Sequence, residues 1–110
     1  MPSNFPLPVP RGWQPDGVVT TESDGSLGWI GNFRFTEDVR SAADRYEQEL
    51  QKMGLEVDKR VMDDGENVDV LMGVTGTING KPYSGILTFS QDQGENVMAI
   101  LFGENPDAAQ

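Results

Sequence analysis

Two short acidic segments hold the residues best suited to chemistry. They are Asp63–Val68 (DDGENV) and Asp92–Val97 (DQGENV), and both read as hairpin turns. In a meander these two turns would lie at the same end of the sheet and gather oxygen ligands of the kind that Ca²⁺ prefers. The candidate metal ligands are Asp63, Asp64, Glu66, Asp92 and Glu95. The spacing does not fit the calcium loop D-x-[DN]-x-[DN]-G, and Asp, Asn and Gly are common in turns, so solvated turn chemistry is the alternative interpretation.

The residue types for catalysis are mostly missing. The chain has no histidine and no cysteine, which excludes thiolate sites and removes the commonest general base. No lysine stands in a Ser-x-x-Lys pattern, and the glycine-rich stretches open no helix that could bind phosphate. A carboxylate pair would need to converge in a cleft with shifted pKa values. We therefore predict a protein that is not an enzyme and has no cofactor.

The charge balance limits the partners. Eighteen Asp and Glu face eight Lys and Arg, for a net charge of −10, which argues against nucleic acid or an anionic membrane as partner. No apolar run approaches the roughly 18 residues of a spanning helix, and no leader is evident, so we expect a soluble domain. The acidity fits either an acidic binding site or a generally acidic source proteome.

One helix is clearly predicted, between two strands. Its apolar stripe recurs at steps of three and four residues, which is the helical period. The stripe consists of Val39, Ala43, Tyr46, Leu50 and Met53. Thr36 is expected to cap its start, with Glu37 and Asp38 in the first turn, and Gly54 is expected to end it in the left-handed conformation.

Six strands are predicted around this helix, at 18–21, 27–35, 55–62, 68–78, 83–90 and 97–102. Asn79-Gly80 is a strong hairpin signal between two of them. The order ββαββββ predicts an α+β fold, with one helix packed on one face of a mostly antiparallel sheet of five or six strands. The helix length implies that the strand after it runs parallel to the strand before it, whose place in the sheet is left undetermined.

Three regions follow from composition. Residues 1–17 hold five of the seven prolines and form a Pro-rich extended lead-in or linker. Residues 18–102 form a single α+β domain, and 103–110 are expected to be a flexible tail.

The sheet face away from the helix is the candidate partner-binding surface. Ile30, Leu71 and Ile86 point to it, joined by either the Val97/Ala99/Leu101 set or the Met98/Ile100/Phe102 set. Either the lead-in folds back over this face, or part of the face is exposed and contacts a protein partner or a second copy.

The order of parts resembles small extracytoplasmic domains of bacterial lipoproteins and other anchored secreted proteins. The residues that carry the resemblance are Pro8-Val9-Pro10-Arg11-Gly12, Phe35-Thr36-Glu37-Asp38-Val39, and Tyr46 to Gly54 with Leu50, while Leu55 stands where an aromatic is usual. The resemblance implies export to the periplasm or cell surface, tethering through the N-terminal segment, and a binding or assembly role. It supplies no catalytic residues.

Two function classes are therefore expected from the sequence. The first is a non-enzymatic binding or assembly module that contacts another protein through the uncovered sheet face. The alternative is a cation-binding domain or a small carboxylate-dependent enzyme that uses the acidic turns. A cytoplasmic location is the alternative to export.

Overall fold

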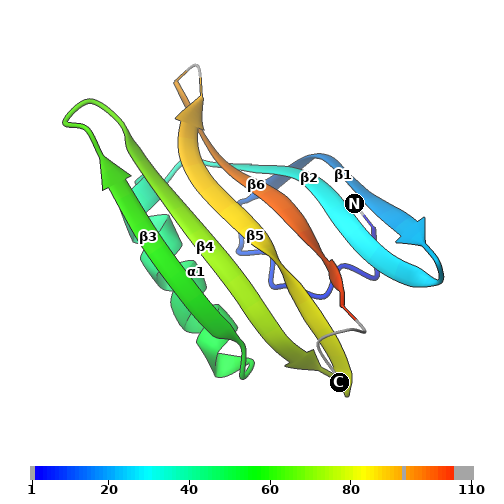
Figure 1. Ribbon diagram of the computed structural model, residues 1–110. Coiled ribbons are helices and arrows are strands. Elements are labelled where there is room, and N and C mark those ends of the chain that lie inside the picture. The colour runs from blue at the N-terminus through cyan, green and yellow to red at the C-terminus, as the bar shows by residue number, and fades with distance from the viewer. Residues whose placement is uncertain (1, 93, 106–110) are drawn as a thin grey trace.

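The computed structural model describes residues 2–92 and 94–105 and contains one helix and six strands (Figure 1). The elements are β1 (Gln14–Ser23), β2 (Ser26–Phe35), α1 (Val39–Lys52), β3 (Glu56–Asp63), β4 (Val68–Ile78), β5 (Lys81–Asp92) and β6 (Glu95–Glu104). The strands form one sheet in the order β1-β2-β6-β5-β4-β3, with every neighbouring pair antiparallel. The predicted α+β fold, with one helix against an antiparallel sheet, is confirmed.

The strand order resolves what the sequence left open. β2 pairs with β6, so the strand before the helix and the last strand are neighbours. Four antiparallel steps separate β2 from β3, so these two strands run parallel, as predicted, at different places in the sheet. The β4–β5 hairpin turns at Asn79 and Gly80, whose φ angles of 51° and 83° are the positive values that this tight turn requires.

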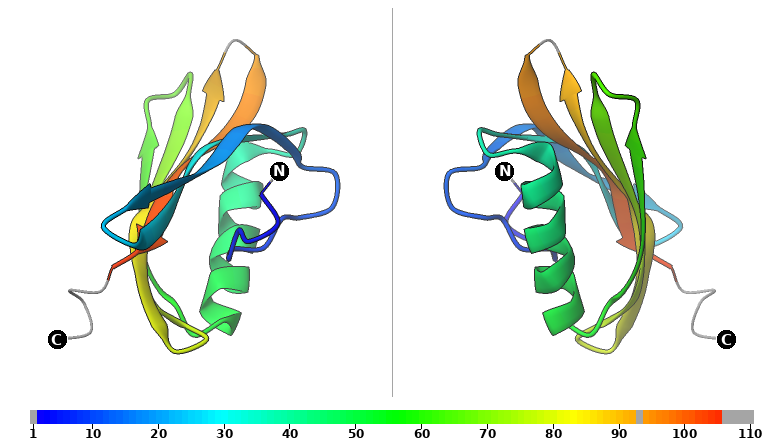
Figure 2. Two further views of the ribbon diagram at one scale, coloured as in Figure 1. Left: turned by 90° about the vertical axis from the view of Figure 1, so that its right-hand side faces the viewer. Right: turned by 90° about the vertical axis from the view of Figure 1, so that its left-hand side faces the viewer.

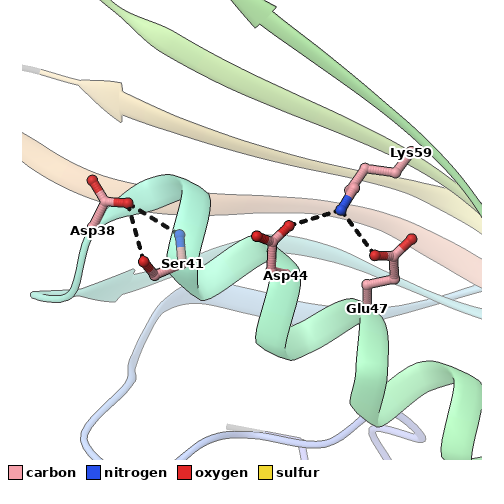
Figure 3. Close-up of polar contacts among 5 residues, drawn as sticks. All are labelled: Asp38, Ser41, Asp44, Glu47 and Lys59. Atoms are coloured by element: carbon pink, nitrogen blue, oxygen red, sulfur yellow. Dashed lines mark hydrogen bonds and ion pairs between the residues drawn. The ribbon is translucent and has the colours of Figure 1, made fainter.

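The helix ends as predicted and begins later than predicted. The N-cap is Asp38, whose carboxylate accepts hydrogen bonds from the backbone N–H and the hydroxyl of Ser41 (Figure 3). The prediction of Thr36 as cap, with acids in the first turn, is wrong. Glu37 is held outside the helix because its carbonyl accepts from Asn96 Nδ2 at 2.7 Å. At the other end, Gly54 has a φ of 86° and stops the helix.

The apolar stripe of α1 packs against the sheet and forms the core with it. Val39, Ala43, Tyr46 and Leu50 are buried, and Met53 packs beside them. Opposite lie the inward side chains of the sheet, among them Phe33, Leu87 and Phe89, which are fully buried. The aromatic side chains of Trp29 and Tyr46 belong to this core.

The Pro-rich segment lies on the same side of the sheet as the helix (Figure 2). Trp13 is buried, and its ring stacks on Tyr46 at 5.4 Å and on Phe35 at 4.7 Å between centroids. The Tyr46 hydroxyl donates to the Pro8 carbonyl at 2.8 Å, and Leu7 is buried nearby. Of the two alternatives left open for the opposite face, the one in which the lead-in covers it is therefore wrong.

The width of the sheet explains this placement. α1 packs against β3, β4 and β5 and leaves the inner sides of β2 and β6 to be covered by something else. The N-terminal segment fills that space, and β1 begins at Gln14, four residues before the predicted strand. At the other end, Gly103 and Glu104 belong to β6, and residues 106–110 of the expected tail lie outside the described part.

Both edges of the sheet carry features that hinder pairing with another strand. On β3, Lys59 points toward the helix, and its amine donates to Asp44 at 2.7 Å and Glu47 at 2.9 Å (Figure 3). The hydrogen bond to Asp44, followed by that to Glu47, raises the pKa of Lys59. On β1, the register shifts between Asp16 and Val19. Inward charges and bulges of this kind commonly protect edge strands from pairing with another chain. A partner is therefore more easily bound by the face of the sheet that α1 does not cover.

Candidate functional site

The outer face, defined as the sheet face away from α1, carries a row of exposed apolar side chains. Val19 pairs with Ile30, Ile30 with Leu101, and Leu101 with Ile86, so the row crosses β1, β2, β6 and β5. We call these four residues the apolar row. Their side chains are 42% to 61% exposed. Neither the helix nor the N-terminal segment covers them, since both lie on the other side (Figure 2).

A row of small residues runs beside the apolar row. Register pairs join Thr21, Gly28, Gly103, Ser84 and Thr75 in turn, from β1 to β4, and end on Glu56 in β3. We call this row the trough. Because its central members lack large side chains, the outer face is hollowed here into an open groove of about 1000 Å³. Ile30, Ile86 and Leu101 line its side.

The structure brings together two of the three partner-binding residues predicted from the sequence. Ile30 and Ile86 are both in the apolar row, joined through Leu101. Leu71 also faces outward but is half-buried in the adjacent row, between Thr88 and Arg60. Of the two sets left open for the last strand, the one that contains Leu101 lies outside.

Val19 was not predicted from the sequence, and Leu101 could not be assigned to one face of the sheet. The last strand, VMAILF, is apolar at every position and therefore has no alternation to read. A usable signal was present in the preceding hairpin: Asp92 pairs with Glu95, and this register places Leu101 opposite Ile86. Val18 and Val19 are adjacent apolar residues, so their type does not show which of them faces outward; Val18 is buried, whereas Val19 is 48% exposed.

All charged residues that line the groove are acidic: Glu56, Asp58 and Glu104. Glu104 is engaged within the fold, because its carboxylate accepts from the Leu27 N–H at 2.7 Å and pairs with Lys81 at 3.3 Å. The Leu27 hydrogen bond, helped by Lys81, lowers the pKa of Glu104. Glu56 and Asp58 make no ion pair with any residue that the structure describes.

The acidic turns lie at the same end of the sheet, as predicted (Figure 1). In the β3–β4 turn, two carboxylates accept hydrogen bonds from backbone N–H groups of the same turn. Asp63 accepts from the Gly65 N–H, and Asp64 accepts from the Glu66 and Asn67 N–H groups at 2.9 and 2.7 Å. These are the local hydrogen bonds that Asp makes in turns.

In the second turn, the carboxylate of Glu95 is engaged by a residue of β2. Glu95 pairs with Arg34 at 3.5 Å and lies opposite Asp92 in the β5–β6 ladder. Among the side chains that the structure describes, which do not include that of Asp92, no three acidic groups lie together so that they could hold a metal ion. The cation site at Asp63, Asp64, Glu66, Asp92 and Glu95 stays a prediction from sequence alone.

The turn hydrogen bonds predict a pH-dependent stability. The N–H groups of Asn67 and Glu66 lower the pKa of Asp64, so its contribution is present above the unfolded-state pKa of about 3.9 and is lost as the pH falls through the folded-state value. We expect Asp64→Asn to lower the urea midpoint at pH 7, with the difference from wild type shrinking below pH of about 4. Glu66→Gln is the matched control. A constant difference across the pH range would contradict the role of the Asp64 charge.

No family model, curated protein or solved structure matches this chain. The function must therefore be inferred from the outer face and its charges. In the described part of the chain, the single helix has 14 residues and is too short and polar to cross a membrane.

Proposed function

We propose that this domain is a non-enzymatic binding or assembly module that contacts another protein through the outer face of its sheet. The observation that carries the proposal is the apolar row. Four large side chains on four adjacent strands stand together in solvent, although the chain has other segments that cover apolar surface. Contiguous exposed apolar surface is typical of interaction sites.

The protected edges support a contact by the face. Lys59 on β3 and the irregular register of β1 hinder the addition of a further strand. The helix side is closed by its own core, in which Tyr46 and Leu50 are almost completely buried. The outer face thus remains as the broad surface on which another protein can pack without disturbing the fold.

We also propose that the domain acts outside the bacterial cytoplasm, tethered through its N-terminal segment. This rests on the resemblance of Pro8–Gly12, Phe35–Val39 and Tyr46–Gly54 to anchored secreted domains. Fractionation of the source cells tests it: we expect the protein in the periplasmic or membrane fraction. Recovery only from the cytoplasm would reject the export proposal and leave the proposed contact surface untouched.

Site-specific photocrosslinking in the source cells tests the contact surface. A photoreactive side chain at Leu101, the most exposed member of the apolar row, is expected to give a defined covalent adduct. The same group at Gln48, exposed on the helix, is the matched control. Ile86→Glu should abolish the Leu101 adduct without unfolding the domain, since exposed substitutions usually change stability by only about 0.5 kcal/mol. Identical adducts from both positions would refute the proposal.

A further inference from the structure

Gly73, at the β3 end of the apolar row, is a glycine that the fold does not require. It lies between Ile86 and Asp58 in the register, inside β4. A Cβ atom built on Gly73 would meet only Asp58 Cβ, at 4.0 Å, which is ordinary van der Waals contact. By contrast, a Cβ on Gly103 would lie 2.9 Å from Gly28 Cα, so the glycine there is needed for close strand packing. Glycine inside a strand weakens it and marks a bulge, a tight bend or a site where a ligand or another backbone approaches closely. Gly73 lies in regular register with Asp58 and Ile86, which leaves close approach as the use of this glycine.

The dimensions of the trough fit one extended chain. It crosses six strands, and the spacing of about 4.8 Å between neighbours gives a length of about 24 Å. Side chains on one face of a strand repeat about every 6.7 Å, so the trough is about one residue row wide. An extended segment of about seven residues matches this length, whereas an α-helix, about 10 Å across, is too wide to enter.

The charges give the trough a direction. Its middle runs along Ile30, Leu101 and Ile86, and its β3 end runs past Gly73 to Glu56 and Asp58. These two carboxylates have no cationic partner among the described residues, and no Lys or Arg of the described part lines the groove. A cation that passes over Gly73 would reach both of them.

We propose that the trough binds an extended segment of a partner protein that is apolar in its middle and carries Lys or Arg at the end that lies over β3. This inference rests on the proposed function and specifies the chemistry of the partner. The apolar residues of the segment pack against the apolar row. Its basic side chain passes over Gly73, where the apolar row ends without a side chain, and pairs with Glu56 and Asp58, which are complementary in charge.

A second copy of this chain fits the trough less well. A twofold axis that places the apolar row of one copy in the trough of the other brings the two β3 ends together. Glu56 of one copy would then face Asp58 of the other, and each copy carries a net charge of −10. Like charges at that position oppose the pairing.

Peptide selection tests the proposal directly. Random peptides of about twelve residues, longer than the seven that span the trough, are displayed on phage and selected on the folded full chain. We retain the peptides that bind the wild-type protein and do not bind the Leu101→Glu variant, in which only an exposed side chain is changed. We expect them to share apolar residues next to at least one Lys or Arg.

Matched variants then locate the basic end. Gly73→Val places a side chain where the apolar row is open, and the double change Glu56→Lys, Asp58→Lys reverses the charge. Each should weaken binding of the selected peptides by about tenfold or more. The controls are Thr88→Val, on the outer face beyond the apolar row, and Glu49→Lys with Glu66→Lys, which shifts the net charge equally at a distance. Circular dichroism checks that each variant is folded.

The outcomes separate the two proposals. Face-specific peptides without basic residues, or with unchanged affinity for the Gly73 and Glu56/Asp58 variants, would overturn the inference and keep the binding face. Peptides that bind wild type and Leu101→Glu equally would overturn both. A dimer in sedimentation that Leu101→Glu dissociates would replace the partner segment with a second copy.

Discussion

Trp13→Ala is expected to lower the free energy of unfolding by about 3–5 kcal/mol, a large part of the 5–15 kcal/mol typical of a domain. Trp13 is buried between Phe35 and Tyr46, and its Nε1 donates to Glu37 at 2.9 Å. Removing the indole leaves a cavity that β2 and α1 line together. Urea unfolding, followed by circular dichroism, measures the loss.

The control for Trp13→Ala lies in the same segment. Val9 is 43% exposed, so Val9→Ala should change stability by no more than about 0.5 kcal/mol. If the two variants were equally stable, the segment before β1 would be a detachable linker. That result would contradict the packing described above.

Gly85→Ala is expected to destabilise the domain by about 3 kcal/mol or more. A Cβ atom at Gly85 would lie 2.3 Å from the Leu101 carbonyl oxygen and 2.5 Å from Phe102 Cα. Both are main-chain atoms, so no change of rotamer relieves the clash, and β5 must separate from β6. Overpacking of side chains alone usually costs less, about 1–3 kcal/mol.

Gly73→Ala is the matched control in the neighbouring strand. Because only Asp58 Cβ lies near its new methyl group, at 4.0 Å, we expect unchanged stability or a gain of about 0.5–1 kcal/mol from the lower chain entropy. Thermal and urea unfolding of both variants measure the contrast. Equal destabilisation by the two substitutions would show that glycine serves the same purpose at both positions.

Elements with local signals were predictable. The stripe from Val39 to Leu50, the stop at Gly54 and the turn at Asn79-Gly80 all depend on residues that are close in sequence. The helix start was misplaced because Thr36 and Asp38 are both good caps. The choice between them depends on Asn96, which binds the Glu37 carbonyl from a strand 59 residues away.

The arrangement of the sheet was harder to predict. The face of the sheet on which the lead-in packs depends on how many strands α1 covers. The order of the elements does not show that number. The binding face was only partly predicted for a related reason. Ile30 and Ile86 alternate clearly with inward residues. The last strand is apolar throughout, so Leu101 is assigned to the outer face only by its pairing with Ile86 in the adjacent strand β5 and with Ile30 in the distant strand β2.

The pairing of β2 with β6 also constrains how the chain can fold as it is made. β2 is synthesised early, and its partner spans Glu95–Glu104, so this long-range pairing forms only after β3, β4 and β5 have emerged. Until then Ile30 and Phe33 belong to an unpaired edge, and Trp13 lacks the Phe89 ring against which it packs. Such non-local pairing slows folding and prolongs the interval in which nascent chains associate. Truncation within the last strand should therefore yield aggregates rather than a shortened domain.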